Sequence, residues 1–243
     1  MIKAITFDFW GTLFKDAFGK ERQEYRAKAI SNILRGAVSL EEAKEALSIA
    51  AKEFARCHIE EQRTLNPEDA VDIVSLHLGV EFSKSQFDFL VEEFATAILV
   101  YQPEPIEGAI DAVKLAYENF PVALISDTGI SPGRSLQKLL DEYEFSQYFS
   151  FCCYSDEVGV SKPRPIMFEL TAEKLNVRPE NILHIGDLEP TDIKGIKEVG
   201  GYGGLFVGVN DKYRNDTRAD FIFQSWYEFI ERFSEIESFV SGR

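Results

Sequence analysis

The sequence predicts an α/β fold, with a core built on a parallel sheet and a helical domain inserted after the first strand. Two observations favour this class. After residue 104, short apolar runs rich in valine, isoleucine and phenylalanine alternate with segments of helical period, which is typical of a parallel sheet with helices on both faces. Between residues 20 and 100 the pattern is helical almost throughout, so this segment interrupts the alternation as an insert.

The composition is that of an acidic globular protein with enough apolar residues for a core. Hydrophobic residues make up 45% of the 243 positions, and 41 acidic against 26 basic side chains give a formal charge of -15. This charge repels nucleic-acid backbones and anionic lipid, and no apolar run approaches the ~20 residues of a membrane span. Three cysteines make no disulfide framework and no leader precedes Ile2, so we expect a cytoplasmic protein without nucleic-acid or membrane partners. The sequence leaves the oligomeric state open.

Five apolar runs are predicted to form strands of the sheet. In chain order they span residues 3–10, 121–127, 181–187, 203–208 and 219–223. They are apolar on both sides, as strands are when helices cover both faces of a sheet. The helices between the later strands are predicted over residues 109–120, 165–177 and 190–200. Cys152 and Cys153 mark a further strand, on which one thiol points inward, and His184 is expected to pack within its own strand.

Two sequence signals predict where helices begin inside the insert. Ser39 stands three residues before Glu42, a spacing typical of a capping box. Pro67 follows Asn66 at the start of another apolar-periodic segment, and proline is favoured at the first position of a helix. The insert is therefore expected to contain separate helices joined by turns.

The stretch from residue 102 to residue 108 contains two prolines and is predicted to be the linker that returns the chain to the sheet. We therefore assign the α/β core domain to residues 1–14 and 104–243, and the helical cap domain to residues 15–103. The segment at residues 225–240 carries apolar side chains at helical spacing and is expected to be a closing helix packed on the sheet.

Polar side chains follow three of the predicted strands at the point where each strand ends. Asp8 follows the first strand, Ser126 and Asp127 follow the second, and Asp187 follows the third. Ligands of open parallel sheets bind in the crevice beyond the carboxyl ends of the strands. We therefore expect these side chains to surround one binding site.

The acidic residues of this set indicate a magnesium site. Asp187 stands in the segment GDLEPTD, which also places Asp192 in the first turn of the next helix. Together with Asp8, these residues offer hard oxygen ligands, which suit Mg²⁺ better than zinc. A magnesium ion bound in this way keeps coordination positions for water and phosphate oxygens.

The remaining polar residues indicate phosphoryl chemistry. Lys162, in GVSKPRP, and the hydroxyls of Thr12 and Ser126 are suited to hold the oxygens of a phosphoryl group. A carboxylate nucleophile, a cation and phosphate donors are the groups needed to form and hydrolyse an aspartyl-phosphate.

Four segments, DFWGTL, LISDTG, SKPRPIMF and IGDLEPTD, resemble in order and spacing the four motifs of the haloacid dehalogenase-like (HAD) hydrolases. The resemblance spans essentially the whole chain, and the helical insert after the first motif is similar to the family's cap of the first type. It implies a hydrolase with a Rossmann-like parallel sheet core of the HAD fold and an inserted helical cap domain.

The resemblance also implies a role for each matching position. It makes Asp8 the nucleophile, and Ser126 and Thr12 the hydroxyls that hydrogen-bond the transferring group. Lys162 matches the lysine that neutralises the nucleophile and the phosphoryl oxygens.

Trp10 departs from the pattern of the family's phosphatases. They normally have an aspartate two residues after the nucleophile, which acts as general acid and then as general base. The indole N–H of Trp10 has too high a pKa to exchange a proton, so this side chain cannot do that work. The family's metal also takes a backbone carbonyl from this position, which a tryptophan supplies. The metal ligands implied by the resemblance are therefore Asp8, the Trp10 carbonyl, Asp187 and Asp192.

Taken together, these residues predict a Mg²⁺-dependent hydrolase of a small phosphorylated molecule that lacks the usual acid. An alternative is a 2-haloacid dehalogenase-like hydrolase acting through an aspartyl ester, since an aromatic residue at the place of Trp10 is familiar there. Another is a phosphonatase with a cap lysine, for which Lys28, Lys44 and Lys52 are candidates. The third is a HAD protein that binds a phosphorylated ligand without chemistry.

The substrate contacts are the least determined part of the site. Trp10, Asp127 and Arg134 are the predicted substrate-binding residues. The ring of Trp10 is expected to separate the site from the cap, and a stacking contact with the substrate is its alternative role. His58 and His77 lie in the insert without the spacing of metal ligands and are expected to be surface or packing residues.

Overall fold

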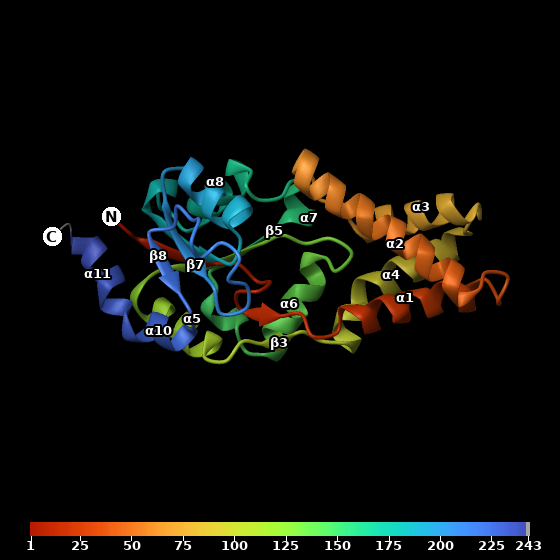
Figure 1. Cartoon of the computed structure of the whole chain (residues 1–243), viewed down its shortest axis with the longest axis horizontal. Coiled ribbons are helices and arrows are strands. Elements are labelled where there is room, and N and C mark those ends of the chain that lie inside the picture. Colours follow the sequence, from red (N-terminus) through yellow and green to blue (C-terminus); the bar gives the residue numbers. More distant parts are fainter. Residues whose placement is uncertain (242–243) are drawn as a thin grey trace.

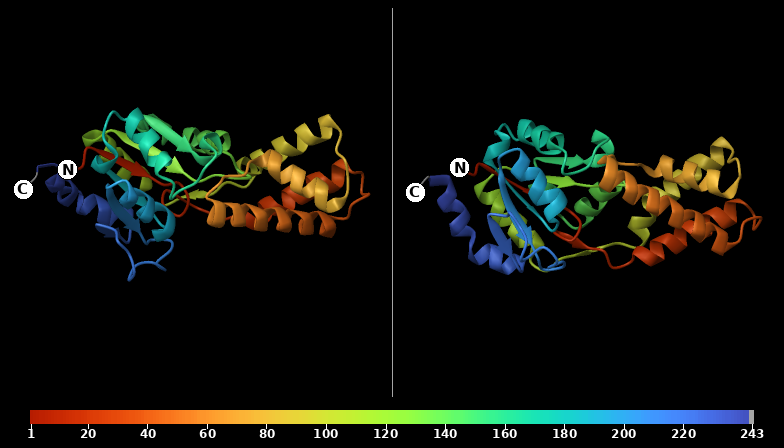
Figure 2. Two further views of the ribbon diagram at one scale, coloured as in Figure 1. Left: turned by 90° about the horizontal axis from the view of Figure 1, so that it is seen from above. Right: turned by 45° about the horizontal axis from the view of Figure 1, so that its top comes forward.

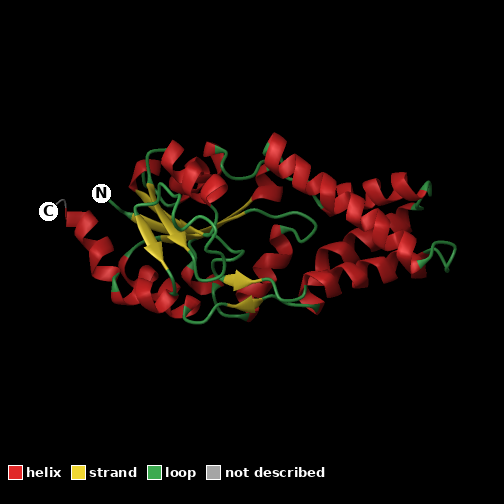
Figure 3. Ribbon diagram, in the orientation of Figure 1, coloured by secondary structure: helices red, strands yellow, loops and turns green. Residues whose placement is uncertain are grey.

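The computed structural model describes residues 1–241 as an elongated molecule with two parts (Figure 1). A large sheet with its helices forms one end, and helices α1, α2, α3 and α4 form the other. Two further views keep the parts at opposite ends of the molecule (Figure 2). The strands of the large sheet gather in one part, whereas the other contains only helices and their connections (Figure 3).

The large sheet has six parallel strands in the order β5-β4-β1-β6-β7-β8. In chain order the strands are β1 (Ala4–Phe7), β4 (Val122–Ser126), β5 (Phe151–Tyr154), β6 (Ile182–Gly186), β7 (Tyr202–Phe206) and β8 (Phe221–Phe223). From β1 the chain extends the sheet first through β4 and β5 and then, on the other side, through β6, β7 and β8. The carboxyl end of β1 is therefore the switch point at which ligands bind in such sheets.

The predicted α/β class and all five predicted strands are confirmed, although the strands are shorter than the apolar runs. The first run was expected to reach residue 10, but β1 ends at Phe7. The backbone turns after this residue, and the N–H groups of Leu13 and Phe14 both donate to the carbonyl of Phe9. The strand marked by Cys152 and Cys153 is β5, in which Cys153 is buried.

Alternate residues of β1 pack into two apolar layers on opposite faces of the sheet. Ile5 and Phe7 join the layer formed with α5 (Ala109–Asn119), α6 (Gly133–Glu142) and α10 (Trp226–Glu231). Ala4 joins the layer formed with α8 (Pro165–Lys174) and α9 (Lys194–Glu198). Helices α8 and α5 accordingly lie on opposite sides of the strands in Figure 1. The sheet is buried on both faces, which explains the apolar runs.

The closing helix expected at residues 225–240 is two helices. Helix α10 ends at Glu231, and α11 (Phe233–Ser241) follows after Arg232, whose backbone leaves the helical region. Trp226, Phe229, Phe233 and Ile236 are buried, as their spacing predicts, whereas the side chain of Val240 lies outside the described residues. The other short helical turns are η2 (Ser146–Tyr148), α7 (Ser155–Val158), η3 (Pro179–Asn181) and the π-helical turn η4 (Glu189–Ile193).

The helical insert, residues 19–100, contains the helices that the capping signals predict. Its elements are α1 (Gly19–Ile33), α2 (Leu40–Arg56), the π-helical turn η1 (Cys57–Glu61), α3 (Pro67–Leu78) and α4 (Lys84–Val100). Ser39 and Glu42 form a capping box, and Asn66 forms another with Asp69, with Pro67 at the first helical position. The helices enclose an apolar core of their own, which is separate from the layers of the sheet.

The two chain passages between the sheet and the insert pair as an antiparallel ribbon of β2 (Phe14–Lys15) and β3 (Glu104–Pro105). The domain boundaries assigned from the sequence, after residues 14 and 103, fall at this ribbon and stay a prediction. Among the helices of the described part of the chain, none combines the length and the apolar character that a membrane crossing requires.

Candidate active site

Asp8 lies at the switch point of the sheet, directly after β1. Its backbone N–H donates to the carbonyl of Ile185 in the neighbouring strand at 2.8 Å, and the residue is only 4% exposed. The turn that follows needs Gly11, whose φ is +68°. A Cβ at this position would also lie 2.5 Å from a carboxylate oxygen of Asp187. Glycine therefore lets the Asp8 loop approach the loop after β6.

Lys162 joins three segments that are distant in the sequence. Its buried Nζ donates to Asp8 Oδ1 at 2.6 Å, to Asp192 Oδ1 at 2.6 Å and to the carbonyl of Ile125 at 3.0 Å. These bonds use all three donors of the ammonium group. Burial alone would lower the pKa of Lys162. The negative charges of Asp192 and Asp8 have the larger effect and hold this pKa above its usual range. The lysine is therefore a fixed positive charge beside the nucleophile position.

Asp8, Asp187 and Asp192 form an acidic cluster, in which one oxygen of each residue lies within 4.8 Å of the others. Burial raises the pKa of Asp187 to about 7, and the charge of Asp192 adds to this effect. Burial also raises the pKa of Asp8 well above its usual value, although Lys162 opposes the shift. At Asp192, burial favours a higher pKa, but the positive charge of Lys162 has the larger effect, and the pKa of Asp192 is lowered. The cluster contains more carboxylates than Lys162 alone can neutralise.

A divalent cation fits this cluster in both charge and donor type. Its carboxylate oxygens are the ligands that Mg²⁺ prefers, and a divalent charge would balance what Lys162 leaves unneutralised. Both oxygens of Asp192 already accept hydrogen bonds, from Lys162 and His184 on one side and from the N–H of Leu188 on the other. The direct ligands available at the cluster are therefore chiefly those of Asp8 and Asp187.

The two hydroxyls predicted to hold a phosphoryl group differ in their present partners. Ser126, the last residue of β4, donates to the carbonyl of Asp127 at 3.2 Å. The hydroxyl of Thr12 is buried and has no hydrogen-bond partner among residues 1–241. A buried hydroxyl without a partner is costly, and a bound anion would remove this cost.

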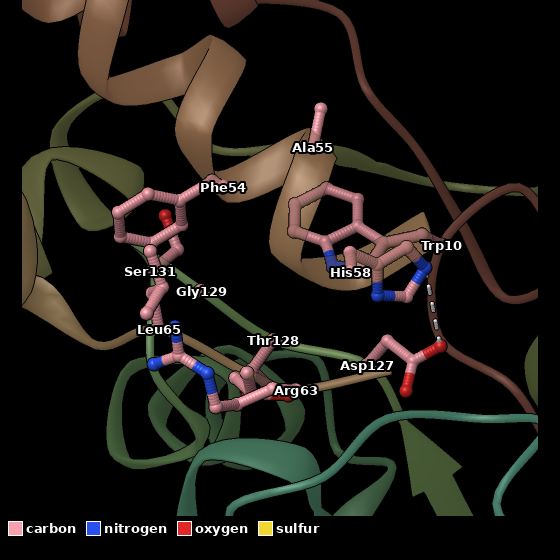
Figure 4. A pocket seen from close by; sticks show the side chains of 11 residues that line it. Trp10, Phe54, Ala55, His58, Arg63, Leu65, Asp127, Thr128, Gly129 and Ser131 are labelled. Atoms are coloured by element: carbon pink, nitrogen blue, oxygen red, sulfur yellow. Dashed lines mark ion pairs between the residues drawn. The ribbon is translucent and has the colours of Figure 1, made fainter. Parts of the chain in front are cut away.

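Asp127 connects the core of the site to the insert. Its Oδ1 accepts the backbone N–H of Lys162 at 2.9 Å, and its Oδ2 lies 3.9 Å from Nε2 of His58 (Figure 4). Burial raises the pKa of Asp127, while the charges of Lys162 and His58 oppose this shift. Asp127 therefore positions the segment that carries Lys162.

A pocket of about 360 Å³ lies between the core loops and the end of α2. Trp10, Asp127 and Thr128 line it from the core, and Phe54 and His58 line it from the insert (Figure 4). The pocket is connected to the candidate site through its wall, because Trp10 stands two residues after Asp8 and Asp127 accepts the backbone N–H of Lys162.

A family model described as haloacid dehalogenase-like hydrolase matches residues 2–200 of the chain. The chain belongs to the haloacid dehalogenase-like hydrolases. Among curated relatives of this HAD hydrolase, glyceraldehyde 3-phosphate phosphatase of Pyrococcus furiosus is 27% identical over 94% of this chain and 88% of its own length. The Rhythmically expressed gene 2 protein of Drosophila melanogaster is 35% identical, but the match covers 41% of this chain and 42% of that protein.

Solved structures share the fold of this HAD hydrolase along nearly the whole chain. The 2-haloacid dehalogenase from Pseudomonas syringae pv. Tomato DC3000 superposes with a TM-score of 0.70 at 19% identity, over 97% of this chain and 100% of its own. The magnesium-bound HAD-hydrolase YfnB from Bacillus subtilis superposes with a TM-score of 0.66 at 16% identity, over 95% and 97% of the two chains. At such identities these likenesses establish the fold alone.

The structure brings together most of the site residues that the sequence of this HAD hydrolase predicts, with one exception. Arg134, expected to contact the substrate, lies at the start of α6 and pairs with Glu92 of α4 at 2.8 Å. Its half-exposed side chain does not line the pocket beside Trp10. Helix α6 packs against α4 of the insert, which places Arg134 beside Glu92 and outside this pocket, so its contact with a substrate stays a prediction.

Sequence reasoning missed the contributions of two histidines in this HAD hydrolase. His184 is fully buried in β6, as expected, but it also bridges Thr6 and Asp192, at 2.9 and 3.1 Å. The parallel register pairs Thr6 with His184, a relation that the sequence alone does not display. His58, expected at the surface or in packing, lines the pocket because the π-helical turn η1 extends α2 toward the core.

Proposed function

We propose that this HAD hydrolase is a Mg²⁺-dependent phosphatase of a small organic phosphate, and that it acts through an aspartyl-phosphate on Asp8. The observation that carries the proposal is the convergence of Asp8, Asp187 and Asp192 around the buried ammonium group of Lys162. The named activity of the Pyrococcus furiosus relative and the magnesium in the Bacillus subtilis structure support the same reading. We also propose a cytoplasmic location, from the acidic composition and the free cysteines.

In the first step, a carboxylate oxygen of Asp8 attacks phosphorus in line with the leaving oxygen. Lys162 neutralises charge on the phosphoryl oxygens, while the hydroxyls of Thr12 and Ser126 donate to them and fix their orientation. Magnesium, held by Asp8, Asp187 and the carbonyl of Trp10 with Asp192 beside it, would supply charge stabilisation of the transferring group.

In the second step, water attacks phosphorus, the bond to the Asp8 oxygen breaks, and inorganic phosphate leaves. The usual acid and base is replaced by Trp10, which cannot exchange a proton. General acid–base catalysis contributes roughly 10²- to 10⁴-fold, so leaving groups that need a proton should be cleaved slowly. Leaving groups that depart as stable anions should be cleaved faster.

The test is hydrolysis of para-nitrophenyl phosphate by the purified chain. We expect turnover that requires Mg²⁺, disappears with a chelator and disappears in Asp8→Asn. Activity that persists without a divalent ion, or in the Asp8 variant, would contradict the proposal. Binding of a phosphate mimic without any turnover would instead show a phospho-ligand-binding protein.

Dehalogenation is the second candidate, because Trp10 places an aromatic ring beside the nucleophile and a dehalogenase shares the fold. Halide release from a 2-chlorocarboxylic acid without added metal would favour it. Lys28 and Lys44 are ion-paired with Glu24 and Glu41 on exposed faces of the insert, which does not favour the phosphonatase alternative.

A further inference from the structure

We propose that the pocket between Trp10 and the insert binds an aromatic leaving group without a charged substituent, so that the substrates of this chain are aryl phosphate monoesters. This inference rests on the proposed phosphatase function and specifies its substrate class. It follows from the position of the pocket, the chemistry of its walls and the absence of a proton donor at Trp10.

The position of the pocket makes it the place for the group attached to phosphorus. Trp10 and Asp127 each stand within two residues of a group that handles the phosphoryl group in the proposed mechanism. A volume of about 360 Å³ is within the size range of small-ligand pockets and accommodates a substituted aromatic ring. The rings of Trp10 and Phe54 lie at opposite sides of the pocket, and Leu65 adds a further apolar wall (Figure 4). Aromatic rings pack favourably on such surfaces.

The charged groups of the pocket wall already have partners and do not favour a leaving group that carries an anionic substituent. Asp127 accepts the N–H of Lys162, and the guanidinium of Arg63 donates to Glu61 at 3.1 Å. With Glu61 paired to Arg63 and the carboxylate of Asp127 also in the wall, the pocket wall carries no excess positive charge. A carboxylate or second phosphate on the leaving group would therefore have to compete with Glu61 for Arg63.

The hydroxyls of the pocket wall offer few hydrogen bonds to a leaving group. Thr128 donates to Asp156, and Ser131 accepts from Arg26 at 3.2 Å. The hydroxyl of Thr64 is buried and has no hydrogen-bond partner within the described chain. A wall with apolar rings and few accessible hydroxyls suits a phenol better than a sugar or a hydroxy acid.

The chemistry of the leaving group favours the same substrate class, aryl phosphate monoesters. When Asp8 attacks an aryl phosphate, the bond from phosphorus to the aryl oxygen breaks and its electron pair leaves on a phenolate. A phenol has a pKa of about 10, so the phenolate departs unprotonated and takes its proton from water afterwards. An alkoxide has a far more basic oxygen and needs the donor that Trp10 does not supply. Water then cleaves the aspartyl-phosphate, giving phosphate and a proton to solvent, so that one ester and one water yield one phenol and one phosphate.

The experiment compares kcat/KM with Mg²⁺ for phenyl phosphate, benzyl phosphate, phosphoglycolate and acetyl phosphate. Benzyl phosphate keeps the ring but has an alkoxide leaving group, whereas acetyl phosphate has a good leaving group without a ring. We expect phenyl phosphate to exceed benzyl phosphate and phosphoglycolate, each by roughly 10²-fold or more, which is the scale of a missing general acid.

The matched variants are Phe54→Ala in the pocket and Phe89→Ala on an exposed face of the insert. In Phe54→Ala, loss of one aromatic contact should raise KM for phenyl phosphate roughly 2- to 10-fold, while KM for acetyl phosphate stays unchanged. In Phe89→Ala, KM should stay unchanged for both substrates. Because Phe54 also packs in the insert, Phe54→Leu should give a smaller effect with the fold retained.

Three results would overturn the aryl assignment while leaving the phosphatase proposal intact. The first is a higher kcat/KM for phosphoglycolate than for phenyl phosphate. The second is an equal loss of kcat/KM for phenyl phosphate and for acetyl phosphate in Phe54→Ala. The third is fast cleavage of benzyl phosphate that His58→Gln abolishes. The last result would identify a proton donor in the pocket. Failure of the phosphatase proposal would look different, because acetyl phosphate would then show no Asp8-dependent turnover.

Discussion

The ends of the strands and the end of helix α2 both border the candidate site, but they are built in opposite ways. At the strand ends, buried charges from distant segments hold one another, as Lys162 holds Asp8 and Asp192 at 2.6 Å. The insert contributes the ring of Phe54, His58 and the half-exposed side chain of Arg63 from consecutive turns of one segment. The comparison teaches that the fold brings the charged groups together from distant segments, whereas one short segment at the end of α2 supplies the insert's part of the pocket wall.

The physical reason lies in the cost of burying charge. A buried ion must be paired and hydrogen-bonded, so the core tolerates few changes in its charged residues. The walls supplied by the insert are apolar or exposed, so changes there bury no unpaired charge.

Replacing Asp8, the proposed nucleophile, should reduce activity strongly without reducing stability. In Asp8→Asn we expect turnover of para-nitrophenyl phosphate to fall by roughly 10⁴-fold or more, because no carboxylate remains to attack phosphorus. Burial raises the pKa of Asp8, so removing its charge should leave the melting temperature unchanged or higher. Asp88→Asn, at an exposed pair with Lys84, is the matched control and should change neither property. Comparable activity in the two variants would contradict the assignment.

Removing the buried cation should affect the fold as well. Lys162→Met leaves Asp8 and Asp192 without their counter-charge, which typically costs 3–5 kcal/mol, about 6–20 °C in melting temperature for a chain of this size. Lys194→Met, at an exposed and loose pair with Glu198, should cost about 1 kcal/mol or less. Equal melting temperatures for the two variants would show that the buried network does not stabilise the core.

The pH dependence of stability should report Asp187. Its pKa is raised to about 7 in the folded chain, so the folded state binds this proton more tightly than the unfolded state does. The stability that the proton contributes is present below about pH 4 and is lost as the pH rises through about 7. Between about pH 5 and about pH 8 without metal, the melting temperature should fall by on the order of 5 °C more in the native chain than in Asp187→Asn.

Magnesium provides the control for this pH effect. At about pH 8, added Mg²⁺ should raise the melting temperature of the native chain, because an ion that binds only the folded state stabilises it. Asp187→Asn should respond much less. If Mg²⁺ raised the melting temperature of both proteins equally, Asp187 would not be part of the ion site.

The smallest effect is expected where the core loop meets the insert. A Cβ at Gly129 would lie 3.2 Å from Cδ1 of Phe54, so Gly129→Ala should displace this ring by a few tenths of an ångström. We expect KM for phenyl phosphate to rise about 2- to 5-fold. KM for acetyl phosphate and the melting temperature should stay nearly unchanged. A loss of activity on both substrates would mean that the insert also positions the catalytic groups.

Much of the core could be predicted from the sequence, since its signals are local. The ends of apolar runs placed Asp8, Ser126 and Asp187, and the capping signals at Ser39 and Asn66 located two helices of the insert. These features depend on residues close in sequence, for which periodicity and helix-start rules are informative.

The pocket wall could not be predicted, because its signals depend on packing between distant segments. Phe54 lies among apolar residues at helical spacing and looks like a core residue, while the π-helical turn that brings His58 to Asp127 has no sequence signature. The pairing of Arg134 with Glu92 and the break of the last helix at Arg232 likewise depend on how the helices pack.

The most direct test of the central claim is mass spectrometry of the chain quenched with acid during turnover of acetyl phosphate. We expect one added phosphoryl group on the peptide that contains Asp8, which forms only with Mg²⁺ and decays when substrate is exhausted. A phosphoryl group on another residue, or turnover with no adduct on Asp8, would contradict the central claim.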